Sequence, residues 1–341
     1  MKHRLITRKQ LNELLDRLAQ EVCLYAPVRD KTGTSWAEIR RADEACLDEV
    51  NTVEPAKGFV FPRCEVLLRF DPQGNPVEPE PPPQQVVFGI RPCDARGIAF
   101  LVKFYTQEGR TDPYVRARRE KTTLIGVACT RTAPTCFCLG VGGSPQGSEG
   151  LDLLLVELGE ELLAEPVTEK GERLVADLPP AEEKHLTAAE EQRKKVEAEI
   201  SLRIDTRKLQ ELLPGLYDTP LWQTLALTCV NCGACTFLCP TCHCFDVTDE
   251  TVRGRTVRCR VWDSCQFALY SRHASGHNPR HDPASRYRNR IMDKFYYTVE
   301  QAGMVSCVGC GRCIISCPAG IDIRQTVGTV QNSKCKLKNE K

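Results

Sequence analysis

The chain has 341 residues, enough for two domains or one large domain with a substantial core. Hydrophobic residues make up 41% and charged residues 27%, which is typical of a globular protein and excludes a disordered or fibrous one. Lys and Arg total 46 against 45 Asp and Glu, so the net charge of +1 argues against binding nucleic acid or a membrane surface through bulk charge. The 20 cysteines need another explanation than disulfides, because a chain of this length folds without them.

The N-terminal segment predicts an amphipathic helix. Leu11, Leu14, Leu15 and Leu18 recur at helical spacing, and Thr7 is a suitable N-cap. The segment lacks the apolar core of a signal peptide, and the chain has no run of 18 apolar residues, so we expect a cytoplasmic protein without membrane insertion. In that compartment thiols stay reduced and clustered cysteines usually bind metal, with a disulfide scaffold as the alternative.

Residues 1–215 predict a mixed α/β domain. Helix-like stretches and turns separate short apolar or β-branched runs at 59–61, 66–70, 85–90, 123–128 and 151–158. Residues 71–84 form a proline-rich surface loop, and the charge-dense segment 180–213 predicts an exposed helical connector. Pro214-Gly215 then marks the domain boundary, which makes residues 216–341 the second domain.

Two cysteine motifs with identical spacing dominate the second domain. They are Cys229-x-x-Cys232-x-x-Cys235-x-x-x-Cys239-Pro240, the first motif, and Cys307-x-x-Cys310-x-x-Cys313-x-x-x-Cys317-Pro318, the second motif. This spacing is that of bacterial two-cluster ferredoxins, in which the fourth Cys of each motif ligates the other cluster. Gly233 and Gly311 supply the backbone freedom that a loop wrapped around a cubane-shaped [4Fe–4S] cluster needs.

The motifs predict two [4Fe–4S] clusters in a ferredoxin-like domain. The ligands of one cluster are Cys229, Cys232, Cys235 and Cys317, and those of the other are Cys307, Cys310, Cys313 and Cys239. A zinc site would instead show two Cys-x-x-Cys pairs separated by a longer loop.

A long insert, residues 241–306, separates the two halves of this domain. It holds nine arginines between Arg253 and Arg290, which would stabilise reduced clusters or form a docking face for an acidic partner. Binding of single-stranded nucleic acid by these arginines is the weaker alternative, because the whole chain is nearly neutral.

The insert also holds three cysteines, Cys242, Cys244 and Cys265. This trio either binds an additional cluster or packs structurally, with Cys259 as a candidate fourth thiol. The nearby Asp263 is a possible carboxylate ligand, and His243, His273, His277 and His281 have no recognised metal spacing.

The N-terminal domain carries a further set of cysteines. Cys93 and Cys129 follow two predicted strands, and Cys136 and Cys138 come shortly after. Because strand ends gather at one edge of an α/β sheet, these four thiols could bind a third cubane, while simple burial of small thiols is the alternative. Four isolated cysteines are interpreted as structural: Cys23, Cys46, Cys64 and Cys335.

Motifs for nucleotide binding and nucleophilic catalysis are missing. Residues 140–145 begin like a dinucleotide loop, but Pro145 replaces the third glycine and no strand leads into the segment, which favours a turn. No Walker loop, G-x-S-x-G elbow or convincing nicotinamide or flavin site is found, so no catalytic residue is assigned. Electrons would then enter and leave through other proteins or through a cofactor that no motif marks.

Several segments resemble a family of iron–sulfur proteins that serve anaerobic sulfite reductase and, as the beta subunit, sulfhydrogenase. The resemblance rests on residues 89–95, 136–138, 239–246, 261–265, 276–280, 307–314 and 318–323. It covers nearly the whole chain, although Cys259 is not part of the family pattern. The resemblance implies an electron-transfer subunit of a cytoplasmic hetero-oligomeric complex, between a flavin subunit that uses NAD(P)H and a terminal catalytic subunit of the sulfite reductase, hydrogenase or heterodisulfide reductase type. The alternative is a self-contained reductase with a substrate-binding cluster.

Overall fold

The computed structural model describes residues 2–31, 33–200, 202 and 204–333, and these divide into two compact units. Unit 1 comprises residues 1–61, 81–202 and 308–310, and unit 2 comprises residues 62–80, 203–307 and 311–341. The units therefore interleave along the chain, whereas the sequence analysis expected one boundary at residue 215. Residues 62–80 join unit 2 through strand pairing with a segment almost 200 residues away, which no local pattern reveals.

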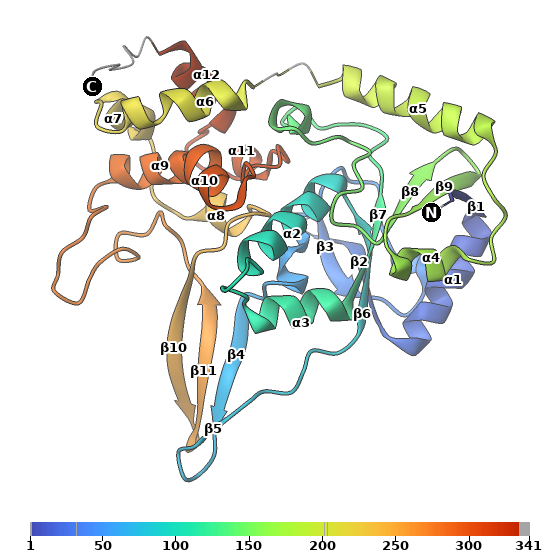
Figure 1. The fold of residues 1–341 in the computed structure, drawn as a ribbon, viewed down its shortest axis with the longest axis horizontal. Helices are drawn as coiled ribbons and strands as arrows, with labels where there is room; N and C mark the ends of the chain where they lie inside the picture. Colours follow the sequence, from blue (N-terminus) through green and yellow to red (C-terminus); the bar gives the residue numbers. More distant parts are fainter. Residues whose placement is uncertain (1, 32, 201, 203, 334–341) are drawn as a thin grey trace. The chain divides into compact units, whose positions relative to one another are not determined.

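Unit 1 is built on a mixed sheet of seven strands among its described residues, in the order β1-β9-β8-β7-β6-β2-β3 (Figure 1). The strands β2, β6, β7 and β8 run parallel, and β3, β9 and β1 pair antiparallel at the two edges. Their bounds are Arg4–Thr7 (β1), Cys23–Asp30 (β2), Gly33–Glu38 (β3), Gln85–Ile90 (β6), Thr122–Val127 (β7), Leu153–Glu157 (β8) and Glu161–Pro166 (β9). The central strands are nearly continuous apolar runs because both faces of the sheet are covered.

Helices surround this sheet in unit 1. They are α1 (Arg8–Glu21), α2 (Pro92–Tyr105), α3 (Pro113–Lys121), α4 (Glu169–Val175) and α5 (Glu183–Ala198), with 3₁₀ turns at Ala42–Glu44, Ala56–Phe59 and Cys138–Val141. The expected N-terminal helix is α1, which begins with a capping box between Thr7 and Gln10. The run 59–61 is not a strand: it is buried where the turn Ala56–Phe59 ends.

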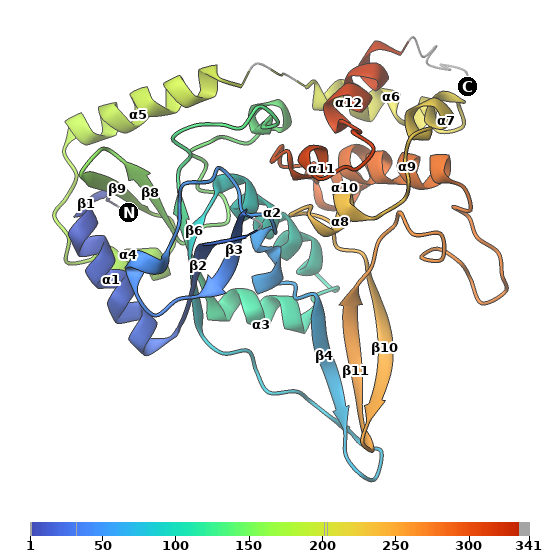
Figure 2. The same ribbon diagram turned by 180° about the vertical axis from the view of Figure 1, so that it is seen from behind.

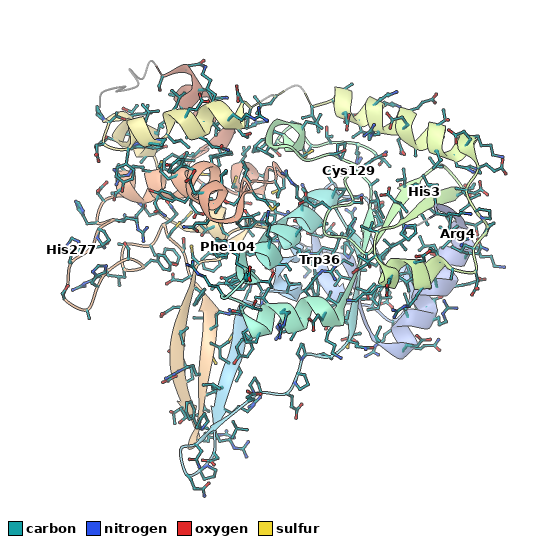
Figure 3. All side chains as sticks on the ribbon, in the orientation of Figure 1. His3, Arg4, Trp36, Phe104, Cys129 and His277 are labelled. Carbon is teal, nitrogen blue, oxygen red and sulfur yellow. The ribbon has the colours of Figure 1, made fainter. Side chains whose placement is uncertain are left out.

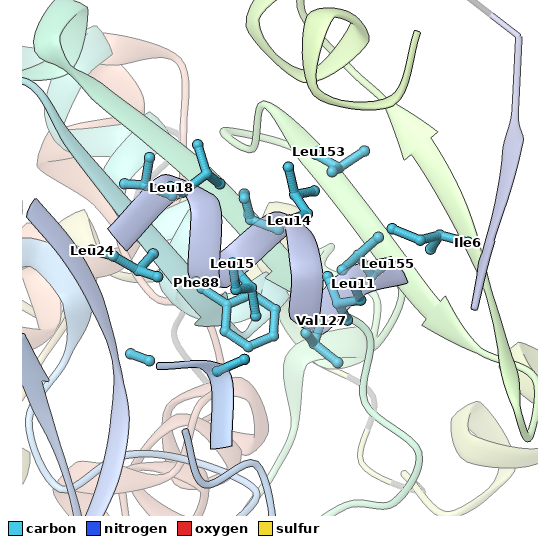
Figure 4. Close-up of a cluster of buried hydrophobic side chains, with 14 of the residues drawn as sticks. Ile6, Leu11, Leu14, Leu15, Leu18, Leu24, Phe88, Val127, Leu153 and Leu155 are labelled. Carbon is cyan, nitrogen blue, oxygen red and sulfur yellow. The ribbon is translucent and has the colours of Figure 1, made fainter. Parts of the chain in front are cut away.

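The largest core of unit 1 lies between α1 and the sheet (Figure 4). Leu11, Leu14, Leu15 and Leu18 of α1 are buried, since their spacing places them on one helical face. That face packs on inward-facing side chains of the sheet, which include Phe88, Val127, Leu153 and Leu155. This packing fixes the start of α1 beside the carboxyl ends of the parallel strands.

Unit 2 combines a narrow antiparallel sheet with a group of short helices (Figures 1 and 2). The sheet order is β10-β11-β4-β5, with bounds Phe245–Val252 (β10), Arg255–Trp262 (β11), Cys64–Phe70 (β4) and Pro76–Val77 (β5). The helices are α6 (Thr206–Leu212), α7 (Leu221–Ala226), α8 (Ala234–Phe237), α9 (Pro283–Met292), α10 (Thr298–Ala302), α11 (Arg312–Ile315) and α12 (Ile323–Asn332), with a 3₁₀ turn at Pro214–Leu216 and a π-helical turn at Asp293–Tyr297. The buried side chains of Arg260 and Glu65 form an ion pair that holds β11 against β4.

Within the described ranges, every helix is too short or too polar to cross a bilayer.

Candidate iron–sulfur centres

The two cysteine motifs fold locally in the same way. In the first motif Gly233 adopts φ +74° and begins α8, and in the second motif Gly311 adopts φ +77° and begins α11. Both angles lie in the left-handed region, which glycine enters without steric cost. A Cβ atom on Gly233 would also lie only 2.8 Å from the Phe267 ring. Each motif therefore turns sharply after its second cysteine and enters a short helix that carries the third.

One cavity of unit 2 brings together the thiols that the sequence assigned to the first cluster. Its lining includes Cys229, Cys232, Cys235 and Cys317, with Cys313, Gln266, Tyr287 and Arg290 beside them. Cys317 comes from the second motif, so the swapped fourth ligand expected from the ferredoxin pattern lies at the same cavity as the first motif. Cys232 is exposed, whereas burial raises the pKa of the Cys235 thiol to about 11.

The thiols assigned to the second cluster are divided between the units. Cys239, Cys307 and Cys313 belong to unit 2, and Cys310 belongs to unit 1 together with its neighbours 308 and 309. Cys239, Cys307 and Cys310 are all buried. The Cys239 thiol lies 3.1 Å from the Thr241 hydroxyl, which in turn donates to the carbonyl of Ser306.

Two buried cations lie among the thiols of unit 2. Arg290 of α9 is 4% exposed and Lys294 of the following π-helical turn is 1% exposed. Burial alone would lower the pKa of Arg290, but the thiolates of Cys235, Cys313, Cys242 and Cys239 outweigh it and hold that pKa well above its usual value.

Lys294 is surrounded in the same way. Burial opposes its charge, yet the thiolates of Cys239 and Cys242 raise the pKa of Lys294 well above its usual value. Its Nζ donates to Thr241 Oγ1 at 3.2 Å and to the Ser306 carbonyl at 2.9 Å. Arg290 is one of the nine insert arginines expected to stabilise reduced clusters, but its burial and the role of Lys294 were not predicted, because no local pattern marks them as buried.

The surroundings of the thiols suit a cubane. Arg290 Nη1 is buried and has no hydrogen-bond partner among the described residues, so this donor group of the guanidinium lacks an acceptor within unit 2. A buried cation requires a nearby anion, and a [4Fe–4S] cluster held by four thiolates is anionic. The donor set and the orphaned guanidinium therefore both fit the cluster.

A single metal ion fits less well than a cluster. Within the part of the chain that the structure describes, no three His, Cys, Asp or Glu side chains are arranged to hold one ion. A tetrahedral zinc ion with Zn–S bonds of about 2.3 Å would need its sulfurs within roughly 4 Å of one another. A cubane instead spreads four thiolates over four iron atoms and needs a wider arrangement.

The three insert thiols form hydrogen-bonded pairs. Cys242 pairs with Cys239, and Cys244 pairs with Cys265. The hydrogen bond from Cys265 is the main cause that lowers the pKa of Cys244.

The candidate fourth thiol of this trio lies elsewhere. Cys259 is on β11, where its side chain contacts Cys64 of β4. Asp263, the possible carboxylate ligand, accepts a hydrogen bond from the Ser264 amide. Cys242 thus has Cys239 as its hydrogen-bonded neighbour, while Cys259 pairs with Cys64 and not with the insert thiols.

Three cysteines of the N-terminal set lie close together in unit 1. Cys129 follows β7 (Figure 3), and burial together with the Cys136 thiolate raises its pKa to about 11. Burial, reinforced by Cys129 and Cys136, raises the pKa of Cys138 to about 12. The fourth member, Cys93, begins α2 and lines a cavity of about 210 Å³ together with Cys138 and Arg96.

Within unit 1, the N-terminal set also lies against residues 309 and 310, the part of the second motif that belongs to this unit. The Cys93 thiol donates to Asn51 Oδ1 at 3.5 Å, and Asn51 Nδ2 donates to the Cys310 carbonyl at 3.1 Å. The Phe137 amide donates to the Gly309 carbonyl at 2.8 Å. A Cβ atom on Gly309 would lie 2.5 Å from the Cys138 nitrogen, so only glycine permits this approach. These contacts could not be predicted from local sequence, because Asn51 and Cys310 are 259 positions apart.

The isolated cysteines have ordinary surroundings. Cys46 donates to Asp48 Oδ2 at 3.7 Å, Cys23 is half-buried on β2, and Cys64 is exposed. Cys335, for which the sequence predicts a structural role, lies outside the described residues. Among the histidines, His273 and His277 pack edge to face, and His243 bonds the Thr241 carbonyl.

Comparison with known proteins independently supports the interpretation of the two motifs as iron–sulfur motifs. A protein-family model described as a 4Fe-4S dicluster domain matches residues 228–321, which include all eight motif cysteines. The chain is 32% identical over 319 residues to sulfhydrogenase 2 subunit beta of Pyrococcus furiosus, a match that covers 91% of this chain and 92% of the relative. The chain belongs to the sulfhydrogenase beta-subunit family of iron–sulfur proteins. No solved structure gives a significant match. The resemblance stated from the sequence is therefore confirmed.

Proposed function

We propose that this chain relays single electrons inside a hetero-oligomeric oxidoreductase in the cytoplasm, between a flavin subunit that uses NAD(P)H and a terminal catalytic subunit. The observation that carries the proposal is the cavity lined by Cys229, Cys232, Cys235 and Cys317 next to the buried Arg290. The family relationship supports it, because the matched relative is named as a subunit of a sulfhydrogenase.

Two cubanes would be held by eight thiols in a ferredoxin-like arrangement with residues 241–306 as the insert. Cys229, Cys232, Cys235 and Cys317 would hold one, and Cys307, Cys310, Cys313 and Cys239 the other. When bound, such clusters supply reversible one-electron storage. The protein's contribution is to fix the thiolates, to balance their charge with the buried Arg290 and Lys294, and to shield Cys239, Cys307 and Cys310 from water.

A third cubane on the N-terminal set would extend the relay. Cys129, Cys136 and Cys138 lie close together, and Cys93 is linked through Asn51 to the Cys310 carbonyl. This set is therefore adjacent to a proposed ligand of the second cluster, which is the position a further relay centre would need.

The experiment that tests the relay uses the full chain purified without oxygen. Its clusters are reduced with dithionite, and sulfite, sulfur and protons are offered as electron acceptors. The proposal expects reversible bleaching of the cluster absorbance and no turnover until the partner proteins are added. Steady turnover by the isolated chain would contradict the relay and support a self-contained reductase with a substrate-binding cluster, held by the N-terminal set beside its 210 Å³ cavity.

A further inference from the structure

A cavity of about 700 Å³ lies in unit 1, and none of its lining residues belongs to the dicluster motifs. It opens where the parallel strands β6, β7 and β8 end, next to the start of α1. Its lining includes apolar residues of α1 and of the sheet, and the charged residues Arg8, Asp48, Arg91, Arg131 and Glu157. Open α/β sheets bind ligands outside the carboxyl ends of their strands, and this volume is within the range of small-molecule sites.

The floor of the cavity is apolar and fixed. Leu11 and Leu15 of α1 meet Phe88, Val127 and Leu162 there, and all five belong to the hydrophobic core. Figure 4 shows the two leucines of α1 directly against Phe88 and Val127. Side chains held in a close-packed core move little, so the floor offers a preformed apolar surface to a ring or hydrocarbon body.

The rim of the cavity carries a positive charge. Arg8 is paired with Glu157 at 3.2 Å, so these two charges offset each other. Arg91 instead donates to four main-chain carbonyls, which include those of Leu47 and Ala128, and Arg131 donates to the carbonyl of Asp48. Carbonyls orient a guanidinium without neutralising it. Three arginines against the carboxylates of Asp48 and Glu157 leave the lining with an excess of one positive charge.

We propose that this cavity binds a ring-bearing organic anion of mononucleotide size, with the ring on the leucine floor and the anionic group between Arg91 and Arg131. The proposal goes beyond the electron relay and does not depend on the two dicluster motifs, because every lining residue belongs to unit 1 and none to those motifs. Cys129 is the one lining residue that is shared with the N-terminal cysteine set. No nucleotide motif marks the site, since its residues come from separate segments of the chain.

Flavin mononucleotide and riboflavin are suitable probes, because they share one ring system and differ by a phosphate. Equilibrium dialysis of each against the full chain would measure affinity from the fluorescence of the free compound. The proposal expects saturable binding of flavin mononucleotide at a single site per chain. Riboflavin should bind about tenfold more weakly, since it lacks the charge-assisted hydrogen bonds.

Matched variants locate the site. Arg131 is exposed, so Arg131→Gln should not disturb folding. The substitution should weaken the binding of flavin mononucleotide about tenfold and leave the affinity for riboflavin unchanged. Asn12 is an exposed residue of α1 that lines the cavity, and Asn12→Phe should weaken the binding of both probes. Arg116→Gln on α3, outside the cavity, is the control and should change neither affinity.

The proposal is overturned if neither probe binds saturably below about 1 mM, the weak end of small-molecule affinities. It is also overturned if both probes bind equally, or if Arg131→Gln and Asn12→Phe behave like Arg116→Gln. Iron content measured on the same samples distinguishes this proposal from the proposed electron relay. Protein that binds the probes but holds no clusters would contradict only the relay.

Discussion

The ammonium group of Lys294 donates a hydrogen bond to Thr241 Oγ1 at 3.2 Å. The same hydroxyl oxygen lies 3.1 Å from the thiol of Cys239, so one hydroxyl connects a buried cation to a proposed cluster ligand. Arg290 precedes Lys294 by about one helical turn and faces the thiols of Cys235 and Cys313. Two cations on one helical segment therefore serve thiols from both motifs, and they provide the charge that a buried anionic cluster requires.

Replacing Arg290 should change the reduction potentials of the clusters. Arg290→Met removes a buried positive charge that favours the more negative, reduced state, so the potential should fall by tens of millivolts, where about 59 mV corresponds to 1.4 kcal/mol for a one-electron couple. A potentiometric titration followed by EPR measures the shift. Arg290→Lys should recover most of it, and Arg255→Met at an exposed position of β11 should leave the potential unchanged. Equal shifts in Arg290→Met and Arg255→Met would contradict a local role for Arg290.

The potentials should be insensitive to pH near neutrality. The neighbouring thiolates raise the pKa of Lys294 above its usual value of 10.5, so its protonated form is favoured and its proton would be lost only at higher pH. Arg290 is likewise held in the charged form. We therefore expect flat midpoint potentials between about pH 6 and 9. A midpoint potential that changes by about 59 mV per pH unit in that window would show that reduction is coupled to protonation of a nearby group. That result would contradict the prediction that Lys294 and Arg290 stay charged in both redox states.

Glycine at position 233 should be essential for building the first cluster. Gly233→Ala places a Cβ atom in a left-handed conformation and 2.8 Å from Phe267. The conformation alone costs about 1–2 kcal/mol, and the close contact adds to it. Gly254 is a matched control, because it has the same φ of +74° with nothing within 4 Å of its Cβ position. Gly233→Ala should lose cluster absorbance near 400 nm, whereas Gly254→Ala should keep it and only lower the midpoint of chemical denaturation. Equal absorbance in both variants would rule out the crowding argument.

Removing one N-terminal thiol should lower the iron content. If Cys129, Cys136, Cys138 and Cys93 hold a cubane, Cys129→Ser should lose about four iron atoms per chain. Cys23→Ser is the control, since Cys23 is half-buried on β2 and isolated from the other thiols in the sequence analysis. Unchanged iron in Cys129→Ser would show that the N-terminal cysteines are structural and would shorten the relay to two clusters.

Many features of the molecule were accessible from local sequence patterns. The capping of α1 by Thr7, the strand 85–90 and the two cysteine motifs each depend on residues within about ten positions of one another. Pairing of β4 with β11 was not predicted, because it joins residues 64–70 to residues 255–262. The burial of Lys294 was missed for a related reason: in isolation a lysine predicts solvent exposure, and only the surrounding thiols make its burial favourable.

The approach of residues 309 and 310 to the N-terminal thiols, within unit 1, was equally hidden. The Phe137 amide meets the Gly309 carbonyl although about 170 residues separate them along the chain. The regular spacing of the motif predicts its iron ligands but says nothing about which distant loop lies against it. The sequence could place Cys129, Cys136 and Cys138 at a sheet edge, and the structure adds their proximity to one another.

The relay depends above all on two cubanes held by the eight thiols of the two motifs. The most direct test is iron and acid-labile sulfide per chain on protein purified without oxygen, with EPR of the reduced form. We predict about eight of each from the two motifs, and about twelve when the N-terminal set is also loaded, with signals of reduced [4Fe–4S] clusters. Zinc without sulfide, or only about four iron atoms per chain, would contradict two cubanes on these thiols.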